Sequence, residues 1–478
     1  MIPSFILAGA GGMLLALACA QEPVWWAAWL APGLLLSAAL LTSSRWRWRA
    51  LLAAGLIGGG TSFEYHAVVS DSWAVAFGLL VGRALLWTWM IGVAARAAER
   101  WRLSAAVFVL PVLAAAAETI IMLVSPHGAA GSYAYSQMDV APLVQIASVG
   151  GTGAILAVVM LGASALGLVV ARCFGWRGRG RAGFSAALAA LFVAGTVIFG
   201  LLRLAGAPAQ ADGPEVALIA QDAIGGGPED VSLLWTSYGE ALDREVRPGR
   251  LVILPEALRT LSDRAAREAA DLLAGLAGRR GATIVAGLIV DRPEGRLNQA
   301  VVALPDGSIR WYDKQHLVPA SEASFSPGHA PLVLEIGGRT IGIAICKDMH
   351  FPALGREYGL LGAEVMLVPA NDFIVDAWMA SRMSALRGVE SGYAIARTAR
   401  RGRLTLTDRY GRVLAEQASG PQLTTIISRL PTAADDGPTL YARFGFVLDW
   451  FWIVSGTLLV WCLPKIGRRE RKFPWVSA

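Results

Sequence analysis

The chain has 478 residues, 55% of them hydrophobic and 16% charged, with a mean hydropathy of +0.50. This apolar excess excludes an ordinary soluble protein, and the length predicts more than one structural unit. The net charge of +6 comes mainly from arginines beside apolar runs, and we expect no nucleic-acid partner.

Apolar runs that could cross a bilayer occur seven times before residue 205 and once near the end. They are Phe5–Ala20, Trp25–Leu41, Ala50–Val69, Trp73–Ala95, Leu103–Val124, Leu143–Val170, Phe184–Leu204 and Phe444–Leu463. The first run could be a cleaved signal peptide, but no Lys or Arg precedes Arg45, so we expect a retained helix. The sequence therefore predicts a membrane domain of seven helices at 1–212, and a final helix with a basic cytoplasmic tail at 433–478.

The arginines of the membrane part predict its orientation. Clusters follow the second, fourth and sixth runs, whereas the loops between these clusters carry no Lys or Arg. The clusters are Arg45, Arg47 and Arg49; Arg96, Arg100 and Arg102; and Arg172, Arg177, Arg179 and Arg181. Positive loops stay in the cytoplasm, so we expect the region after the seventh run to lie outside it.

Three ionisable residues, Glu64, His66 and Glu118, fall within or near the apolar runs. Ionisable groups at membrane depth are costly and usually face a protein interior or a wet cavity. A structural hydrogen-bonding role and a substrate role both remain open for them.

Residues 213–432 alternate short β-rich runs with amphipathic stretches, which predicts a separate α/β domain. The expected strands are Val216–Gln221, Leu251–Pro255, Thr283–Val290, Asn298–Leu304, Ile309–Tyr312, Ile341–Ile345, Val365–Pro369, Ala394–Ala399 and Leu404–Thr407. The expected helices are Val231–Arg247, Leu261–Arg279, Ala353–Leu361 and Ala377–Gly388.

Three of these strands end near a residue suited to nucleophilic chemistry: Glu256, Lys314 and Cys346. A buried free cysteine is most often a small hydrophobic core residue, and this is the simplest interpretation of Cys346 when it is considered by itself. Together, a carboxylate can take the thiol proton and an ammonium can stabilise the negative charge that develops. The sequence therefore predicts a Glu-Lys-Cys nucleophile site.

Lysine and cysteine are both rare in this chain. The four lysines are Lys314, Lys347, Lys465 and Lys472, and the four cysteines are Cys19, Cys173, Cys346 and Cys462. Only Cys346 lies in the expected soluble domain, so no disulfide framework is predicted. The five histidines show no zinc-like spacing with cysteine, and we expect no metal and no cofactor.

Several motifs resemble a known family. Pro255-Glu256-Ala257, the run from Tyr312 to Pro319, and Ile345-Cys346-Lys347-Asp348 resemble the nitrilase, or carbon–nitrogen hydrolase, superfamily. That resemblance implies an αββα sandwich with a Glu-Lys-Cys triad. With membrane runs on both sides of the domain, the chain is similar to the apolipoprotein N-acyltransferase family. Tyr133–Gln137, Gln145–Ala147 and Leu440–Gly445 agree with that resemblance.

The resemblance implies Glu256 as general base, Lys314 as stabiliser of the intermediate and Cys346 as acyl-carrying nucleophile. It places a second glutamate at Glu322. It further implies a phospholipid donor, a thioester on Cys346 and a diacylglyceryl-cysteine lipoprotein as acceptor. The expected location is the bacterial inner membrane, with the catalytic domain on the periplasmic side, and we expect a monomer.

The chain departs from the family pattern at two places. Lys347 and Asp348 replace the usual Tyr and Glu, and the loop after Asp372 is short and lacks Trp-Phe-Gly. Lys347 could lower the pKa of the thiol or could point away from it. Lys347, Asp348 and Asn371 are predicted to contact substrate. A membrane-tethered amidase or an acyltransferase for another amine, and a non-catalytic membrane scaffold, remain the alternatives.

Overall fold

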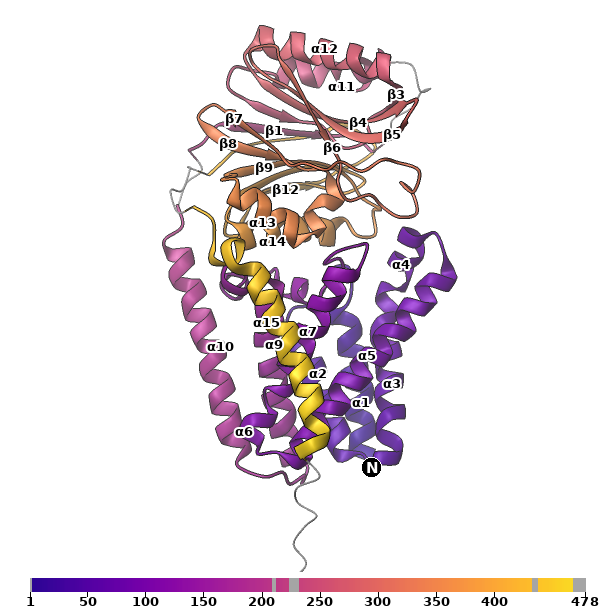
Figure 1. The fold of residues 1–478 in the computed structure, drawn as a ribbon, viewed down its shortest axis with the longest axis vertical. Coiled ribbons are helices and arrows are strands. Elements are labelled where there is room, and N and C mark those ends of the chain that lie inside the picture. The colour runs from indigo at the N-terminus through magenta and orange to yellow at the C-terminus, as the bar shows by residue number, and fades with distance from the viewer. Residues whose placement is uncertain (1, 209–211, 223–231, 432–436, 467–478) are drawn as a thin grey trace, which may run out of the picture.

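The computed structural model describes residues 2–208, 212–222, 232–431 and 437–466, and it has a helical part and a part of two stacked sheets (Figure 1). The start of the expected helix Val231–Arg247, the expected junction at 432/433 and the basic tail lie outside the described residues. The helices before the first strand are α1 (Ile2–Ala18), α2 (Ala27–Leu41), α3 (Ser44–Gly59), α4 (Phe63–Ser70), α5 (Trp73–Arg100), α6 (Leu103–Ala106), α7 (Val109–Val124), α8 (Ala141–Val144), α9 (Ala147–Cys173) and α10 (Ala182–Ala205). The last helix is α15 (Leu440–Ile466).

Within the described residues, five helical segments are long and apolar enough to cross a membrane. They are Trp73–Arg100, Leu103–Val124, Ala147–Cys173, Ala182–Ala205 and Leu440–Cys462, and α1 and α2 are shorter apolar helices. The expected total of eight spans stays a prediction.

Glycines divide two of the expected spans. The run Ala50–Val69 is interrupted by a 3-10 turn at Gly60–Ser62, so α3 and α4 are separate helices. Within the sixth run, α8 is separate and the start of α9 is kinked at Gly150 and Gly151, where Gly151 has φ 63°. Glycine adopts this left-handed conformation without steric cost, so the helix can break here although the surrounding sequence stays apolar.

Thirteen strands form the two sheets in the described residues. One sheet has the order β13-β1-β2-β4-β5-β6, with β3 paired to β4, and the other has the order β12-β11-β10-β9-β8-β7. The strands are β1 (Glu215–Ala220), β2 (Leu251–Ile253), β3 (Thr260–Ser262), β4 (Thr283–Arg292), β5 (Gly295–Ala303), β6 (Ile309–Asp313), β7 (Leu332–Ile336), β8 (Arg339–Ile343), β9 (Val365–Asn371), β10 (Ala394–Arg400), β11 (Arg403–Thr407), β12 (Val413–Ala418) and β13 (Thr424–Arg429).

The two sheets pack face to face, with helices on their outer faces (Figure 1). Apolar side chains from both sheets, such as Leu218 and Ile343, share one buried cluster between them. The helices α11 (Ser232–Glu245) and α12 (Asp263–Arg280) cover the first sheet, while α13 (Pro352–Leu360) and α14 (Ala377–Ser391) cover the second. This is the α/β sandwich expected for residues 213–432, because each sheet must bury both of its apolar faces.

The helix α14 lies between the second sheet and the helical part (Figure 1). Its apolar side chains, including Met383 and Leu386, belong to the same buried cluster as the membrane-type helices. A carboxylate oxygen of Glu390 on α14 accepts a 2.9 Å hydrogen bond from the Thr152 N–H, just after the α9 kink. These contacts fix the sandwich against one end of the helical part.

Candidate active site

Three strand ends bring the predicted triad to one edge of the sandwich. Glu256 lies three residues after β2, Lys314 directly follows β6, and Cys346 lies three residues after β8. Cys346 has φ 44° and Ala257 has φ 53°, both in the left-handed region that non-glycine residues rarely adopt. Such strain costs on the order of 1–3 kcal/mol at each residue and persists only where the surroundings hold it, often at functional sites.

The ammonium of Lys314 lies between two carboxylates. Its Nζ is 2.8 Å from Glu256 Oε1 and 2.9 Å from Glu322 Oε2, and all three side chains are buried. Charges this deep are tolerated only when they are paired and hydrogen-bonded. The structure therefore brings Glu256, Lys314 and Glu322 together as one buried ionic group.

Asn298 completes this group, and it was not predicted as a site residue because it falls inside an ordinary strand pattern. Its amide nitrogen donates to Glu256 Oε1 at 2.7 Å and to Glu322 Oε1 at 2.6 Å. The Val318 N–H donates to Glu322 Oε2 at 2.7 Å. Glu322 is thus held on three sides, and its charge is directed at Lys314 rather than at the thiol.

The protonation states of the site follow from burial. Burial raises the pKa of the Cys346 thiol well above its usual value, and the Glu256 charge raises it further, while Lys314 opposes both. Burial also raises the pKa of Glu256, again opposed by Lys314. Burial alone would lower the pKa of Lys314, but the charges of Glu256, Cys346 and Glu322 reverse this and raise it. The resting site therefore holds a thiol, a carboxylate that binds protons readily and a permanent cation.

Asp348 holds the turn that carries the nucleophile. Its side chain is fully buried, and its Oδ2 accepts from the Ile345 N–H at 3.0 Å and from the Tyr312 hydroxyl at 2.8 Å. Its Oδ1 accepts from the N–H groups of His316 at 2.8 Å and Gln315 at 3.2 Å. One carboxylate thus joins the Cys346 turn to the segment after Lys314, so the positions of these two residues are linked.

The side chain of Lys347 is hydrogen-bonded to the same segment. Its Nζ donates to the Leu317 carbonyl at 2.6 Å, and its side chain is 2% exposed. Burial, and then the Lys314 charge, lower the pKa of Lys347 to about 8. Lys347 is thus a cation near the site whose charge is easily lost.

Asn371 meets the thiol with its backbone rather than with its side chain. Its carbonyl oxygen is 3.8 Å from Cys346 Sγ, while its side-chain oxygen accepts from Arg400 and Arg401. The next residue, Asp372, forms a buried two-bond pair with Arg397, at 2.5 and 3.0 Å. This pair fixes the start of the short loop that leads into α14.

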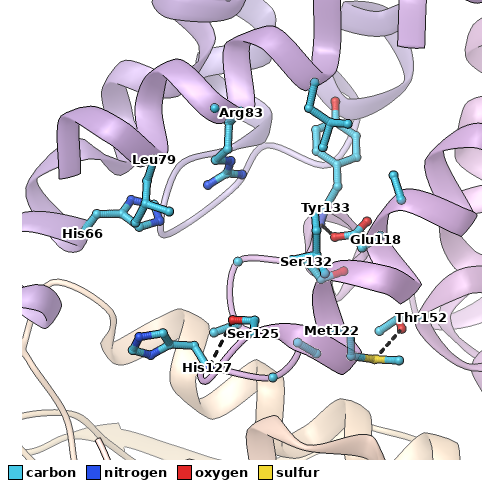
Figure 2. A pocket seen from close by; sticks show the side chains of 18 of the residues that line it. His66, Leu79, Arg83, Glu118, Met122, Ser125, His127, Ser132, Tyr133 and Thr152 are labelled. Atoms are coloured by element: carbon cyan, nitrogen blue, oxygen red, sulfur yellow. Dashed lines mark hydrogen bonds between the residues drawn. The ribbon is translucent and has the colours of Figure 1, made fainter. Parts of the chain in front are cut away.

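A cavity of about 400 Å³ lies among the helices on the side that faces the sandwich (Figure 2). It is lined mainly by apolar residues of α4, α5, α7 and α9 and by residues 125–133. This 125–133 loop touches the active-site segment directly, because the Ala129 N–H donates to the His350 carbonyl at 2.9 Å. Gly128, with φ 57°, allows the close approach, since a Cβ there would lie 2.6 Å from the His350 oxygen. The cavity wall and the turn after Cys346 are therefore one packed unit.

The geometry supports acyl transfer through a cysteine. The thiol can act as a nucleophile, Glu256 can receive its proton, and Lys314 can stabilise an oxyanion. Among the described residues, no group of three or more His, Cys, Asp or Glu side chains could hold a metal ion.

Comparisons with known proteins agree with both parts of the chain. Residues 11–165 match the family model for the apolipoprotein N-acyltransferase N-terminal domain, and residues 228–432 match the model for carbon–nitrogen hydrolase. An apolipoprotein N-acyltransferase from Geobacter metallireducens is 25% identical over 378 residues, which cover 69% of this chain and 68% of that protein.

Two amidases are also similar to parts of this chain. An (R)-stereoselective amidase from Pseudomonas sp. is 37% identical over 76 residues, or 16% of this chain and 28% of the amidase. The solved structure of an amidase from Nesterenkonia sp. AN1 is 24% identical, covers 50% of this chain and 95% of its own, and has a TM-score of 0.42. The two family models match separate parts of one chain, and the acyltransferase relative extends over most of it. Together these matches make the chain similar, over most of its length, to the apolipoprotein N-acyltransferases of the nitrilase superfamily.

Proposed function

We propose that the protein transfers a fatty acyl chain from a membrane phospholipid, through a thioester on Cys346, to the N-terminal amine of a diacylglyceryl-cysteine lipoprotein. The observation that carries this proposal is the position of Cys346. It stands beside the Glu256–Lys314 pair, in a turn whose next residues pack on the wall of a largely apolar cavity among membrane-type helices. Substrates anchored in a bilayer can reach a nucleophile in this position.

In the first step, the Cys346 sulfur attacks the ester carbonyl of the phospholipid while Glu256 takes the thiol proton. Since burial raises the pKa of the thiol, no standing thiolate is available and this proton transfer must accompany attack. Lys314 stabilises the oxyanion of the tetrahedral intermediate. Collapse breaks the ester C–O bond, and the proton on Glu256 passes to the departing oxygen, which leaves as a lysophospholipid.

In the second step, the neutral α-amine of the lipoprotein attacks the thioester carbonyl. Glu256 accepts a proton from the attacking nitrogen, and Lys314 again stabilises the oxyanion. The C–S bond breaks, the sulfur regains a proton, and an amide is released. Glu322 and Asn298 take no part in bond making, because both are engaged in holding Glu256 and Lys314.

We also propose that the protein lies in the bacterial inner membrane, with residues 213–432 forming a periplasmic catalytic domain. The arginine clusters support this orientation. In Figure 1 the first residues of α1 lie at the end of the helical part that is far from the sheets, which agrees with a cytoplasmic start.

The test uses purified full-length protein in phosphatidylethanolamine vesicles with a synthetic diacylated lipopeptide. We expect equal amounts of lysophospholipid and triacylated peptide, and neither product with Cys346→Ala, which should fold normally because it removes only one sulfur. Absence of both products with the folded parent protein contradicts the proposal.

A membrane-tethered amidase is the second candidate, and it is favoured by the amidase relatives and by Lys347 beside the nucleophile. Water would then replace the lipoprotein amine in the second step. A panel of small amides tested beside the lipopeptide separates the two, since hydrolysis of amides without lipopeptide acylation supports only the amidase.

A further inference from the structure

Arg83 is a cation in the membrane-side cavity, and it forms no ion pair with any residue that the structure describes. It lies in the middle of α5, and Figure 2 shows its guanidinium directed into the cavity. Its one hydrogen bond, to the Ser62 hydroxyl, is long at 3.4 Å. Among the residues that the structure describes, no carboxylate lies within ion-pair distance of it. Charges at membrane depth are costly and usually mark a ligand site or a partner.

The acid on the opposite wall is already engaged. Glu118 on α7 accepts a 2.8 Å hydrogen bond from the Tyr133 N–H and also bonds to Ser132 (Figure 2). Its carboxylate is therefore hydrogen-bonded to the 125–133 loop, and it attracts Arg83 across the cavity without forming an ion pair with it. The cavity thus keeps a guanidinium whose donors suit a bidentate oxyanion such as a phosphate.

The cavity also has room for apolar chains beside this cation. Its volume of about 400 Å³ lies in the range of small-molecule sites, and most of its lining is apolar. On α5 itself, Gly78 and Gly82 line the cavity, and a Cβ at either position would meet nothing within 4 Å. The helix face around Arg83 is therefore open to an occupant.

The cavity lies close to the nucleophile. Ala129, which lines it, donates a 2.9 Å hydrogen bond to the carbonyl of His350, four residues after Cys346. Arg83 shares a smaller adjoining hollow with Met379 of α14, the helix that follows the Asn371–Asp376 segment beside the thiol. A lipid whose phosphate bonds to Arg83 could thus present its ester toward Cys346.

We propose that Arg83 anchors the phosphodiester of the acyl-donor lipid, whose chains occupy the cavity between α4, α5 and α7. This inference rests on the proposed function for the identity of the donor, and it assigns headgroup recognition to a membrane helix rather than to the sandwich.

The test measures lipid retention by native mass spectrometry on full-length Cys346→Ala protein, which cannot turn over. The probes are phosphatidylethanolamine, phosphatidylglycerol, diacylglycerol with the same chains, and inorganic phosphate. We expect Arg83→Gln to weaken retention of both phospholipids about 10- to 100-fold and to leave diacylglycerol unchanged. The control Arg96→Gln removes an exposed arginine of the same helix, about 20 Å away, and should change nothing.

A second variant, Gly82→Leu, places a side chain in the open space and should abolish phospholipid retention without disturbing the helix. Undiminished phospholipid retention in Arg83→Gln or in Gly82→Leu overturns the proposal. An equal loss of diacylglycerol in Arg83→Gln, which indicates structural damage, also overturns it. Displacement of phospholipid by millimolar inorganic phosphate shows a site for free anions and overturns the lipid assignment.

Failure of the proposed function gives a different result. If Arg83-dependent phospholipid binding is present but catalytically intact protein makes no lysophospholipid, the lipid site stands and the acyltransferase proposal fails. If Arg83→Gln makes lysophospholipid at the parental rate at low phospholipid concentration, the acyltransferase proposal stands and the anchor is wrong.

Discussion

Replacing Asp348 by Asn tests whether this buried carboxylate positions the nucleophile or contacts substrate. Its Oδ2 accepts from one N–H and one hydroxyl, and its Oδ1 accepts from two N–H groups and also lies 3.2 Å from Nδ1 of the His316 ring. An asparagine keeps the shape but offers one carbonyl oxygen, and its NH2 group must face two donors. Two hydrogen bonds to a charged acceptor are lost, at about 1.5–3 kcal/mol each, so we expect about 3–6 kcal/mol of destabilisation.

The catalytic consequence follows from the turn that Asp348 holds. Without its bond to Ile345 N–H, Cys346 is no longer kept in its left-handed conformation beside Glu256 and Lys314. A displacement of about 1 Å at a reacting atom costs roughly 100-fold in rate. We therefore expect kcat for lysophospholipid release to fall about 100-fold while KM changes little.

The assay combines thermal unfolding in detergent with steady-state kinetics in phospholipid micelles. A loss of about 3 kcal/mol in a domain of this size lowers Tm by roughly 6–12 °C. The control, Asp291→Asn, removes a 44% exposed carboxylate paired with Arg296 and should lower stability by less than about 1 kcal/mol. A raised KM with unchanged kcat and Tm would show that Asp348 binds substrate and would refute the positioning argument.

Three further predictions concern Glu256, Lys347 and the buried Asp372–Arg397 pair. Glu256→Gln removes the proton acceptor, so acylation of Cys346 should slow about 10²- to 10⁴-fold by quenched-flow mass analysis; a loss below about tenfold contradicts its role as base. The pKa of Lys347 is lowered to about 8, so its charge is present below that pH and lost above it. Activity should therefore decline through pH 8, and Lys347→Arg should remove this decline; identical alkaline profiles would show that the charge is not used. Asp372→Asn breaks the buried pair with Arg397 and should cost about 3–5 kcal/mol, so an unchanged melting temperature argues against that pair as a stabilising contact.

The strand ends next to Glu256, Lys314 and Cys346 could be predicted from sequence because strand ends are local features. Short apolar runs preceded Glu256, Lys314 and Cys346, and the structure has β2, β6 and β8 there. In the first sheet β2 is parallel to β4, and the antiparallel pairings of β4 with β5 and of β5 with β6 return β6 to the same direction, so the ends of β2 and β6 lie at one edge. The sequence could not show how the two sheets face each other. The distances between the site residues could therefore be obtained only from the structure.

Residues whose role depends on packing gave no sequence signal. Asn298 reads as an ordinary strand residue, yet it bridges two glutamates that are 66 positions apart. Arg397 likewise meets Asp372 only because β9 and β10 pair in parallel. Asp348 was expected to contact substrate, and the hydrogen bonds that surround its buried carboxylate could not be inferred from its position after Cys346.

The strands that were not predicted are mostly edge or polar strands. β7 and β12 are the two edges of the second sheet, β13 is an edge of the first, and many of their side chains are partly exposed. Their sequences therefore lack the continuous apolar run of a buried strand. Among the membrane-type helices, apolar length did not show the breaks at Gly60 and Gly151, because composition stays apolar through them.

The most direct measurement is the intact mass of the protein after incubation with phospholipid vesicles and no acceptor. The account predicts one added fatty acyl chain, carried on Cys346, released by neutral hydroxylamine and discharged by a diacylated lipopeptide. It also predicts no added mass in Cys346→Ala or at other cysteines. An unmodified Cys346 in folded protein that nevertheless acylates the lipopeptide would contradict the thioester mechanism.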